Sequence, residues 1–504
     1  MKTPVDSVTR LHETRFLLFT ILYASTWLPT EATTTTSTTS TQQLLIGFKA
    51  TPNPTVSSFQ SLLTDPTGNF SLGFIRVNST QLALVVLHVP STEPLWLANP
   101  TNLATWSDRT QLIFNGSLVI SDPQTRVFWS TGTEGDKVVL LTNSNLQVVK
   151  LDSLFSVRWQ SFDFPYNTLV ENQNFTSTMS LVSSNGLYNM LLGSDFMGLY
   201  AAFKDKADRQ IYWKHGALEA KAQVVVGQGP IHAQVNSNGY LGMYQNSNKP
   251  VDVQPFNSFQ RPITGLLTVR LEPDGNLKGY YWDGSNWILD YQAISDTCEL
   301  PSPCGSYGLC IPGSGCSCLD NRTEFQSGSC FASSSGDFCS EEDVESEYWV
   351  LTRKGVELPF KELMRYEMAS SLELCEGFCA KNCSCWGTVY NNASGFCYIV
   401  DYPIQTLVGV GDESKVGYFK VRKGSGKKRV DVGFRIGIGI GIGLLCGAIV
   451  ILIGVVGFTS RRIWRRQRGV NGFLEEDCGA SPGPYKDLGS ASFKSIEIEM
   501  CQNR

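Results

Sequence analysis

Residues 115–129 read NGSLVISDPQTRVFW: a polar turn at Asn115 and Gly116, a run of alternating apolar residues, and Trp129 14 positions after Asn115. Similar units begin at residues 143, 238 and 274, as Asn-Ser-Asn-Leu, Asn-Gly-Tyr-Leu and Asp-Gly-Asn-Leu, and two of them lead to Trp159 and Trp287. Asn, Asp and Gly tolerate positive φ, so each unit predicts a tight turn between two short strands. One unit cannot bury its own apolar face, and such repeats usually stack around a shared core. The repeat therefore predicts mainly β domains.

Three further stretches link this pattern to a known family. They are NFSLGF at residues 69–74, LWLAN at 95–99 and WQSFDFP at 159–165. Together they closely resemble the bulb-type, or monocot mannose-binding, lectin module of plant S-locus glycoproteins and G-type lectin receptor-like kinases. The resemblance implies a bulb-type lectin domain at residues 43–165, built as a β-prism of three four-stranded sheets. Residues 166–293 resemble the second lectin-like domain of the same ectodomains, which implies tandem β-prisms.

Cysteine usage places the next part of the chain in an oxidising compartment. Of 15 Cys, none lies between Ala32 and Thr297, and twelve crowd into residues 298–397. An even dozen in so short an exported stretch predicts disulfides rather than a metal site. The first six resemble an EGF-like module at residues 296–331, of a calcium-free kind. The next six resemble a PAN/apple α+β module at residues 339–421.

The two cysteine resemblances imply particular pairs. They are Cys298–Cys310, Cys304–Cys316, Cys318–Cys330, Cys375–Cys397, Cys379–Cys385 and Cys339–Cys383. Within the second module, Ser370 and Glu373 form a capping-box signature that predicts the start of a helix. That helix would place Cys375 and Cys379 one turn apart on a common face.

Two apolar segments predict export and a membrane anchor. Residues 1–32 have the features of a signal peptide, with an uncleaved signal anchor as the alternative, and residues 33–42 form a Thr/Ser-rich spacer. Residues 436–458 run uncharged for 23 positions, long enough for a transmembrane helix. A short cytoplasmic tail at 459–504 would follow. The expected location is the plasma membrane, in single-pass type I orientation with the N-terminal side extracellular.

The predicted span has a glycine pattern of its own. Small residues spaced by four let two membrane helices approach closely, although glycine is common in membrane spans in any case. The candidate helix-association residues are Gly437, Gly439, Gly441, Gly443 and Gly447.

Seven N-glycosylation sequons all lie on the side predicted to be extracellular: Asn69, Asn78, Asn115, Asn174, Asn321, Asn382 and Asn392.

Sugar binding in the bulb-lectin family rests on the motif Q-x-D-x-N-x-V-x-Y, and the copies here are degraded. The copy at residues 113–121 keeps only Val119, and the copy at 141–149 keeps only Asn145. The best match is in the second domain, where the candidate ligand-binding residues are Glu272, Asp274, Asn276 and Tyr280, with Lys278 in place of the packing Val. The alternative is a tight turn whose side chains satisfy their own backbone.

No catalytic constellation stands out in the chain. With four His, no phosphate-binding glycine loop and a net charge of −5, we expect no enzyme, no cofactor, no metal and no nucleic-acid partner. The sequence favours a non-catalytic, disulfide-bonded cell-surface glycoprotein without a kinase domain, acting as a receptor-like protein or co-receptor. Its expected partners are an extracellular protein or glycan ligand, and a second copy or a kinase-bearing S-domain receptor. The alternative is a genuine membrane lectin for mannose-type carbohydrates.

Overall fold

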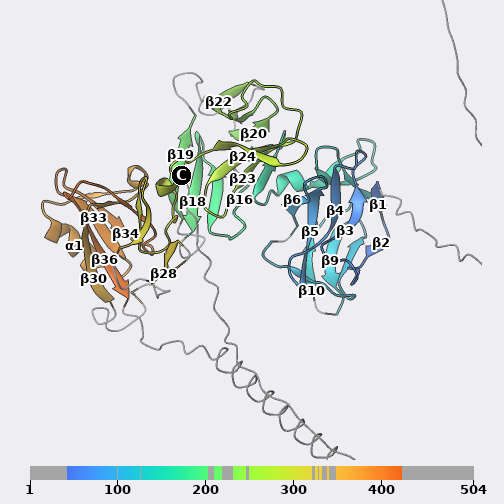
Figure 1. Ribbon diagram of the computed structural model, residues 1–504. Coiled ribbons are helices and arrows are strands. Elements are labelled where there is room, and N and C mark those ends of the chain that lie inside the picture. The colour runs from blue at the N-terminus through green and yellow to red at the C-terminus, as the bar shows by residue number, and fades with distance from the viewer. Residues whose placement is uncertain are drawn as a thin grey trace, which may run out of the picture. The chain divides into compact units, whose positions relative to one another are not determined.

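The protein is described by a computed structural model that covers residues 42–98, 100–124, 126–202, 209–217, 231–245, 249–319, 324–326, 328–331, 338–339 and 348–422. Its elements are mainly β-strands, as predicted, and α1 (Leu372–Ala380) is the one α-helix among the described residues (Figure 1). The predicted signal peptide, most of the spacer, the span with its five glycines, the tail and Asn321 lie outside them. Within those ranges, no helix has the length and apolar character needed to cross a bilayer.

The first half of the fold, here called the first prism, consists of three antiparallel sheets. The early strands β1 and β2 each complete a sheet whose other strands come later in the chain. The sheets are β3 (Phe59–Thr64), β4 (Phe70–Arg76), β5 (Gln81–His88) and β6 (Glu93–Leu97), with β7 (Ala104–Thr105) beside β5; β10 (Arg126–Ser130), β9 (Leu118–Asp122), β8 (Gln111–Phe114) and β2 (Phe48–Ala50); and β1 (Gln43–Leu45), β11 (Lys137–Leu140), β12 (Leu146–Val149) and β13 (Val157–Gln160).

Three tryptophans explain why the repeat unit ends in a large aromatic residue. Trp96, Trp129 and Trp159 come one from each sheet, and each ring meets the other two edge to face with centroids 5.6–5.8 Å apart. Edge-to-face packing is a preferred aromatic geometry. Trp96 Nε1 also donates to the carbonyl of Phe164 at 2.8 Å, so its buried polar group is satisfied. The three sheets thus share one core, as the repeat predicts.

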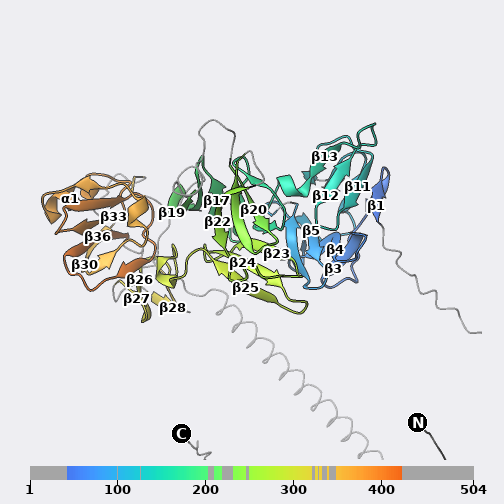
Figure 2. The ribbon, with the colours of Figure 1, turned by 90° about the horizontal axis from the view of Figure 1, so that it is seen from above.

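A second set of three four-stranded antiparallel sheets, the second prism, follows directly. Each sheet again takes its first strand from an early segment of the chain. The sheets are β14 (Thr168–Val170), β23 (Leu267–Leu271), β24 (Leu277–Trp282) and β25 (Trp287–Gln292); β15 (Phe175–Thr176), β20 (His232–Asn236), β21 (Tyr240–Tyr244) and β22 (Pro250–Pro255); and β16 (Leu181–Val182), β17 (Tyr188–Leu192), β18 (Phe196–Ala202) and β19 (Arg209–Gly216) (Figure 2).

The repeated turns have a common backbone requirement. Gly116, Ser144, Gly239 and Gly275 occupy the same position of the four units, and all have positive φ, between 71° and 106°. Glycine adopts this region without a Cβ penalty, whereas Ser144 must be held there by its surroundings. The Asn/Asp-Gly signature in the sequence therefore marks a real conformational constraint.

The described part ends in disulfide-bonded segments. Their strands are β26 (Gly308–Ile311), β27 (Gly315–Cys318), β28 (Glu324–Gln326), β29 (Ser329–Phe331), β30 (Tyr348–Lys354), β31 (Val356–Glu357), β32 (Glu367–Met368), β33 (Gly387–Asn391), β34 (Phe396–Val400), β35 (Leu407–Gly409) and β36 (Lys415–Arg422). Strands β30, β36, β33, β34 and β32 form one antiparallel sheet, against which α1 packs. The six disulfides are Cys298–Cys310, Cys304–Cys316, Cys318–Cys330, Cys339–Cys383, Cys375–Cys397 and Cys379–Cys385, the same pairs that the resemblances imply.

The start of α1 corrects one detail of the sequence analysis. The N-cap is Ser371, whose hydroxyl accepts a hydrogen bond from the backbone N–H of Leu374 at 3.3 Å. Ser370 lies one residue too early, and Glu373 is then the second helical residue, so the predicted capping box is wrong. Cys375 and Cys379 are nevertheless both buried on the helix, one turn apart, where each forms its disulfide.

Candidate functional site

The best-preserved sugar motif lies on the hairpin of β23 and β24, and its side chains are paired with one another. The Tyr280 hydroxyl donates to Glu272 Oε1 at 2.8 Å. Lys278 Nζ lies 2.8 Å from Asp274 Oδ2. Burial and the hydrogen bond to Glu272 raise the pKa of Tyr280, so it is a neutral donor at physiological pH. A ligand at this surface would have to compete with these contacts.

Asn276 has a structural role. Its side chain is buried, with Nδ2 donating to the carbonyl of Ile294 at 2.7 Å and Oδ1 accepting from the N–H of Ile294 at 3.0 Å. Asp274 Oδ1 accepts from the N–H of Asn276 at 2.8 Å. This is the arrangement of the alternative interpretation, a turn whose side chains satisfy backbone groups. Asn276 is thus fully engaged in fixing the chain after β25.

The same hairpin carries a contact between the two prisms that the sequence analysis missed. Arg270, beside Lys278 in the register, holds Glu93 of β6 through two hydrogen bonds, at 2.5 and 3.3 Å. Its guanidinium carbon lies 5.6 Å from the centre of the Tyr280 ring. Burial opposes the charge, but the bonds and charge of Glu93 outweigh it and raise the pKa of Arg270. The contact is therefore a charge-assisted, bidentate pair.

The two copies in the first prism serve its turns. Asn115 is exposed, and its Oδ1 accepts from the N–H of Ser117 at 3.2 Å. Asn145 is buried, with Nδ2 donating to Gln160 Oε1 at 2.9 Å. Gln147 Nε2 shares that acceptor at 3.2 Å. Asn145 Oδ1 also accepts from the N–H of Phe162 at 3.4 Å, so the retained Asn145, like Asn276, holds the backbone that follows the last strand of its sheet.

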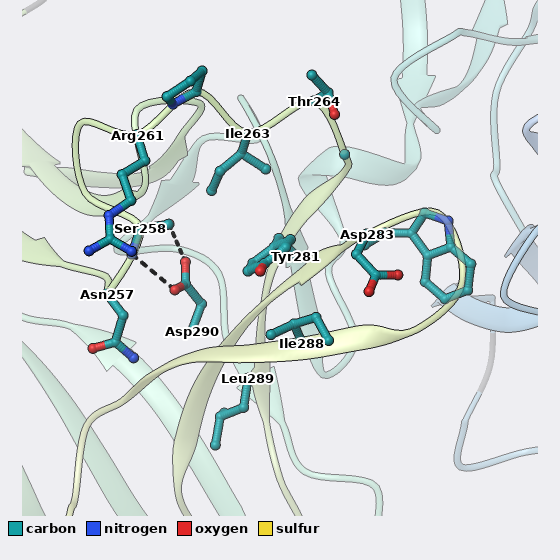
Figure 3. Close-up of a pocket in the computed structure, with 13 residues that line it drawn as sticks. Asn257, Ser258, Arg261, Ile263, Thr264, Tyr281, Asp283, Ile288, Leu289 and Asp290 are labelled. Atoms are coloured by element: carbon teal, nitrogen blue, oxygen red, sulfur yellow. Dashed lines mark hydrogen bonds between the residues drawn. The ribbon is translucent and has the colours of Figure 1, made fainter.

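A cavity lies elsewhere, between the loop after β22 and the β24–β25 hairpin. Its volume is about 460 Å³, within the range of small-molecule sites. Figure 3 shows Arg261, Asn257 and Asp290 on one side and Tyr281, Ile263 and Ile288 towards the middle. Gly265 is required here, because a Cβ at this position would lie 1.7 Å from the carbonyl oxygen of Trp282. No sequence motif pointed to this site.

The polar groups of the cavity are not equally available to a ligand. Asp290 is buried, and its carboxylate accepts from the Ser258 N–H at 3.0 Å and from the Ser258 hydroxyl. Asp283 accepts from two N–H groups of its own turn, which lower its pKa. Arg261 is exposed, and within the described part of the chain its guanidinium has no hydrogen-bond or ion-pair partner. Arg261 thus supplies several unused donors to the cavity.

A histidine forms a second contact between the prisms. His88 of β5 is buried, and its ring centre lies 5.5 Å from Trp282 and 5.6 Å from Trp287. Its Nδ1 lies 2.8 Å from the Ser91 hydroxyl. Burial among these rings lowers the pKa of His88, while nearby Glu93 acts in the opposite direction. The ring is therefore neutral in the folded protein at neutral pH.

We expect acidification to weaken this contact. The folded-state pKa of His88 is below its usual 6.5. The neutral ring therefore makes its full contribution to the free energy of unfolding above pH 6.5, and this contribution is lost as the pH falls through the folded-state pKa. Because one group takes up one proton, the free energy of unfolding changes by at most about 1.4 kcal/mol per pH unit. Hydrogen exchange of β5 and β24 between about pH 7.5 and 5 should show wild type losing more protection than His88→Phe. Equal losses in both proteins would contradict the prediction.

Comparison with known proteins identifies the family. Over 456 residues the chain is 57% identical to a PAN domain-containing protein of Arabidopsis thaliana, covering 90% of this chain and 92% of that one. The chain belongs to this PAN domain-containing family. No family model matches the chain.

This PAN domain-containing family is related to receptor kinases. The chain is 25% identical over 459 residues to the G-type lectin S-receptor-like serine/threonine-protein kinase SD2-5 of Arabidopsis thaliana, covering 84% of this chain and 53% of the kinase. A second such kinase is 26% identical over 409 residues, which cover 72% of this chain and 42% of the kinase. The resemblance to the G-type lectin receptor family is thus confirmed, while the chain spans about half the length of these kinases.

Solved structures similar to this PAN domain-containing protein include two lectins. A Marasmius oreades lectin matches 25% of this chain and 93% of its own, at 15% identity and a TM-score of 0.18. The two-domain, fetuin-binding agglutinin of Scilla campanulata matches 47% of this chain and all of its own, at 19% identity and a TM-score of 0.19.

The predicted glycosylation sites of this family member can be placed on its surface. Asn69, Asn78, Asn115, Asn174, Asn382 and Asn392 are all exposed, which glycan attachment requires. Their modification stays a prediction.

Proposed function

We propose that this protein is a non-catalytic cell-surface receptor-like protein or co-receptor that recognises an extracellular ligand through its lectin-like prisms. Its homology to G-type lectin S-receptor-like kinases over 84% of its length carries the proposal. In this proposal residues 296–331 form an EGF-like module and residues 339–421 a PAN module that supply protein contacts. The proposal also includes the predicted signal peptide and the predicted span at residues 436–458, which would anchor the protein in the plasma membrane in type I orientation.

Within this function, the cavity of the second prism is a better ligand site than the inherited sugar motifs. In the motif at Glu272–Tyr280, the polar side chains already bond to one another or to the backbone. The cavity combines apolar walls with the unused donors of Arg261, the pattern of a site that orients a ligand bearing an acceptor group. A kinase-bearing relative would serve as the partner in the membrane.

A mannose-type membrane lectin remains the second candidate. One observation favours it: Asp274 is exposed, and Glu272, Lys278 and Tyr280 are only half-buried, so solvent reaches all four side chains. A sugar could exchange its hydroxyls for the present partners at little net cost, since hydrogen bonds exchanged in this way differ by about 1 kcal/mol.

A glycan array with the purified full-length protein separates the two candidates. We expect no robust binding of mannose-type glycans, because the groups of the motif are engaged internally. Asp274→Ala is the test variant, and Asp195→Ala, in an exposed turn of the same prism, is the matched control. Binding that Asp274→Ala abolishes and Asp195→Ala leaves intact would establish the lectin and contradict the receptor proposal.

The receptor proposal is also tested in the membrane. Proximity labelling from a promiscuous ligase fused to the C-terminus of the intact protein should mark a kinase-bearing receptor. A membrane protein with an unrelated exterior, carrying the same ligase, is the control. If both baits label the same proteins, the co-receptor function has no support.

A further inference from the structure

One end of the first prism displays an unusual number of apolar side chains. Leu154 and Phe155, between β12 and β13, are 85% and 66% exposed, among the highest values for large apolar residues in the described part of the chain. About half of each of four more side chains is exposed nearby: Leu45, Ile46, Leu151 and Val157. We call these six residues the loop patch.

Strand register places the loop patch at one edge of a single sheet. Leu45 pairs with Lys137, Lys137 with Val149, and Val149 with Val157, so β1, β11, β12 and β13 end together (Figure 2). With strands about 4.8 Å apart, the row spans roughly 15 Å. The remaining patch residues adjoin this row, either beside Leu45 or in the loop between β12 and β13.

The loop is built to hold its apolar side chains outward. Asp152 accepts hydrogen bonds from the N–H groups of Leu154 and Ser156 at 3.2 and 3.0 Å, and from the Ser156 hydroxyl at 2.5 Å. These bonds lower the pKa of Asp152, with that from the Ser156 hydroxyl contributing most. Phe155 has a φ of +49°, which disfavours a bulky residue. A strained residue held by a polar network indicates a surface arranged for contact.

We propose that the loop patch is a self-association surface, where a second copy of this chain binds through the same residues around a two-fold axis. The exposed fractions amount to an apolar area on the order of 600 Å², the upper end of what monomers display. A standard interface buries about 800 Å² per partner, so the patch supplies most of the apolar centre of a dimer.

The charges around the loop patch fit a second copy better than a charged partner or a lipid surface. Lys150 pairs with Asp136 at 3.0 Å and Arg158 with Asp152 at 3.3 Å, while Lys137 adds one positive charge to the row, so each copy carries little net charge here and two copies would repel only weakly. The sequons of the first prism lie on the other two sheets, at Asn69, Asn78 and Asn115. The sheet of β1, β11, β12 and β13 has none, but the Gly116 carbonyl accepts from the Gly135 N–H at 2.7 Å, so a glycan at Asn115 would border the patch.

A glycan introduced within the loop patch, which would keep two copies apart, tests the proposal in the full-length chain. Leu154→Asn turns residues 154–156 into the glycosylation tripeptide Asn-Phe-Ser, and Asp108→Asn creates a matched sequon in an exposed loop elsewhere on the prism. With two differently tagged copies in one cell, we expect co-precipitation of wild type, a loss of about tenfold or more for Leu154→Asn, and no loss for Asp108→Asn. A shift on endoglycosidase treatment reports whether each glycan is attached.

Two cysteine variants and a variant with a charged residue cover the remaining outcomes. Near a two-fold axis, Leu154→Cys should form a disulfide-linked dimer that Asp108→Cys does not form. If no glycan is attached to Leu154→Asn, the variant Leu154→Asp is used instead, because it places a charge in the patch. Absence of wild-type self-association overturns the proposal. Association that survives both Leu154 substitutions, without dimers of Leu154→Cys, also overturns it. No external ligand is involved, so these results are independent of the receptor function.

Discussion

Trp159→Ala should destabilise the first prism by about 3–5 kcal/mol, a large part of the 5–15 kcal/mol that holds a typical domain together. The ring meets Trp96 and Trp129 edge to face at 5.6 Å and stacks on Phe164 at 5.7 Å. Removing it leaves a cavity where all three sheets meet. Only partial collapse is expected, because Trp96 and Trp129 belong to two different sheets.

The measurement is hydrogen exchange of the strand amides of the first prism, together with the urea midpoint of unfolding. Protection of β4, β9 and β12 should fall together, since one core serves all three sheets. Val77→Ala, at an exposed apolar residue of the same prism, should change the stability by no more than about 0.5 kcal/mol. A loss confined to β12 and β13 would show that the sheets do not share a core.

The tryptophans also show what local sequence can predict. A turn with a positive-φ residue, two short strands and a buried aromatic are all determined within about 15 residues, so the repeat predicts them directly. The disulfide pairs within residues 298–330 each join cysteines 12 positions apart, and a local resemblance suffices to name them. The cap of α1 was misplaced because Ser370 and Ser371 are neighbours, and side-chain type alone cannot choose between them.

Contacts across long sequence separations could not be read in this way. Arg270 and Glu93 lie 177 residues apart and belong to different prisms. The cavity at Arg261 depends on a loop whose approach to Trp282 is set by Gly265. The sugar motif itself was visible, but its side chains bond to partners, such as Ile294, that no motif includes. The motif therefore predicted where these side chains lie, but not whether they are free to bind a ligand.

Lys420→Met in the disulfide-bonded α+β segment should cost about 1.5–3 kcal/mol, since it removes the charge-assisted hydrogen bonds to two carbonyl groups, each of which then keeps only a backbone N–H donor. Lys420 is fully buried on β36, and its Nζ donates at 2.9 Å to the carbonyls of Cys379 and Asn382. Burial lowers the pKa of Lys420. The ammonium lies at the C-terminal end of α1, where the helix dipole favours a cation.

The opposing effect is the removal of a buried charge, which can stabilise a protein when apolar packing replaces it. Met has nearly the volume of Lys, so packing is preserved and the loss of the two charge-assisted hydrogen bonds decides the sign. Lys381→Met, at an exposed position next to α1, is the matched control. Exchange protection of Leu372–Ala380 should fall in Lys420→Met and stay unchanged in Lys381→Met. If Lys420→Met were instead as protected as wild type, the ammonium would be dispensable, and the disulfides at Cys375 and Cys379 alone would hold the helix to the sheet.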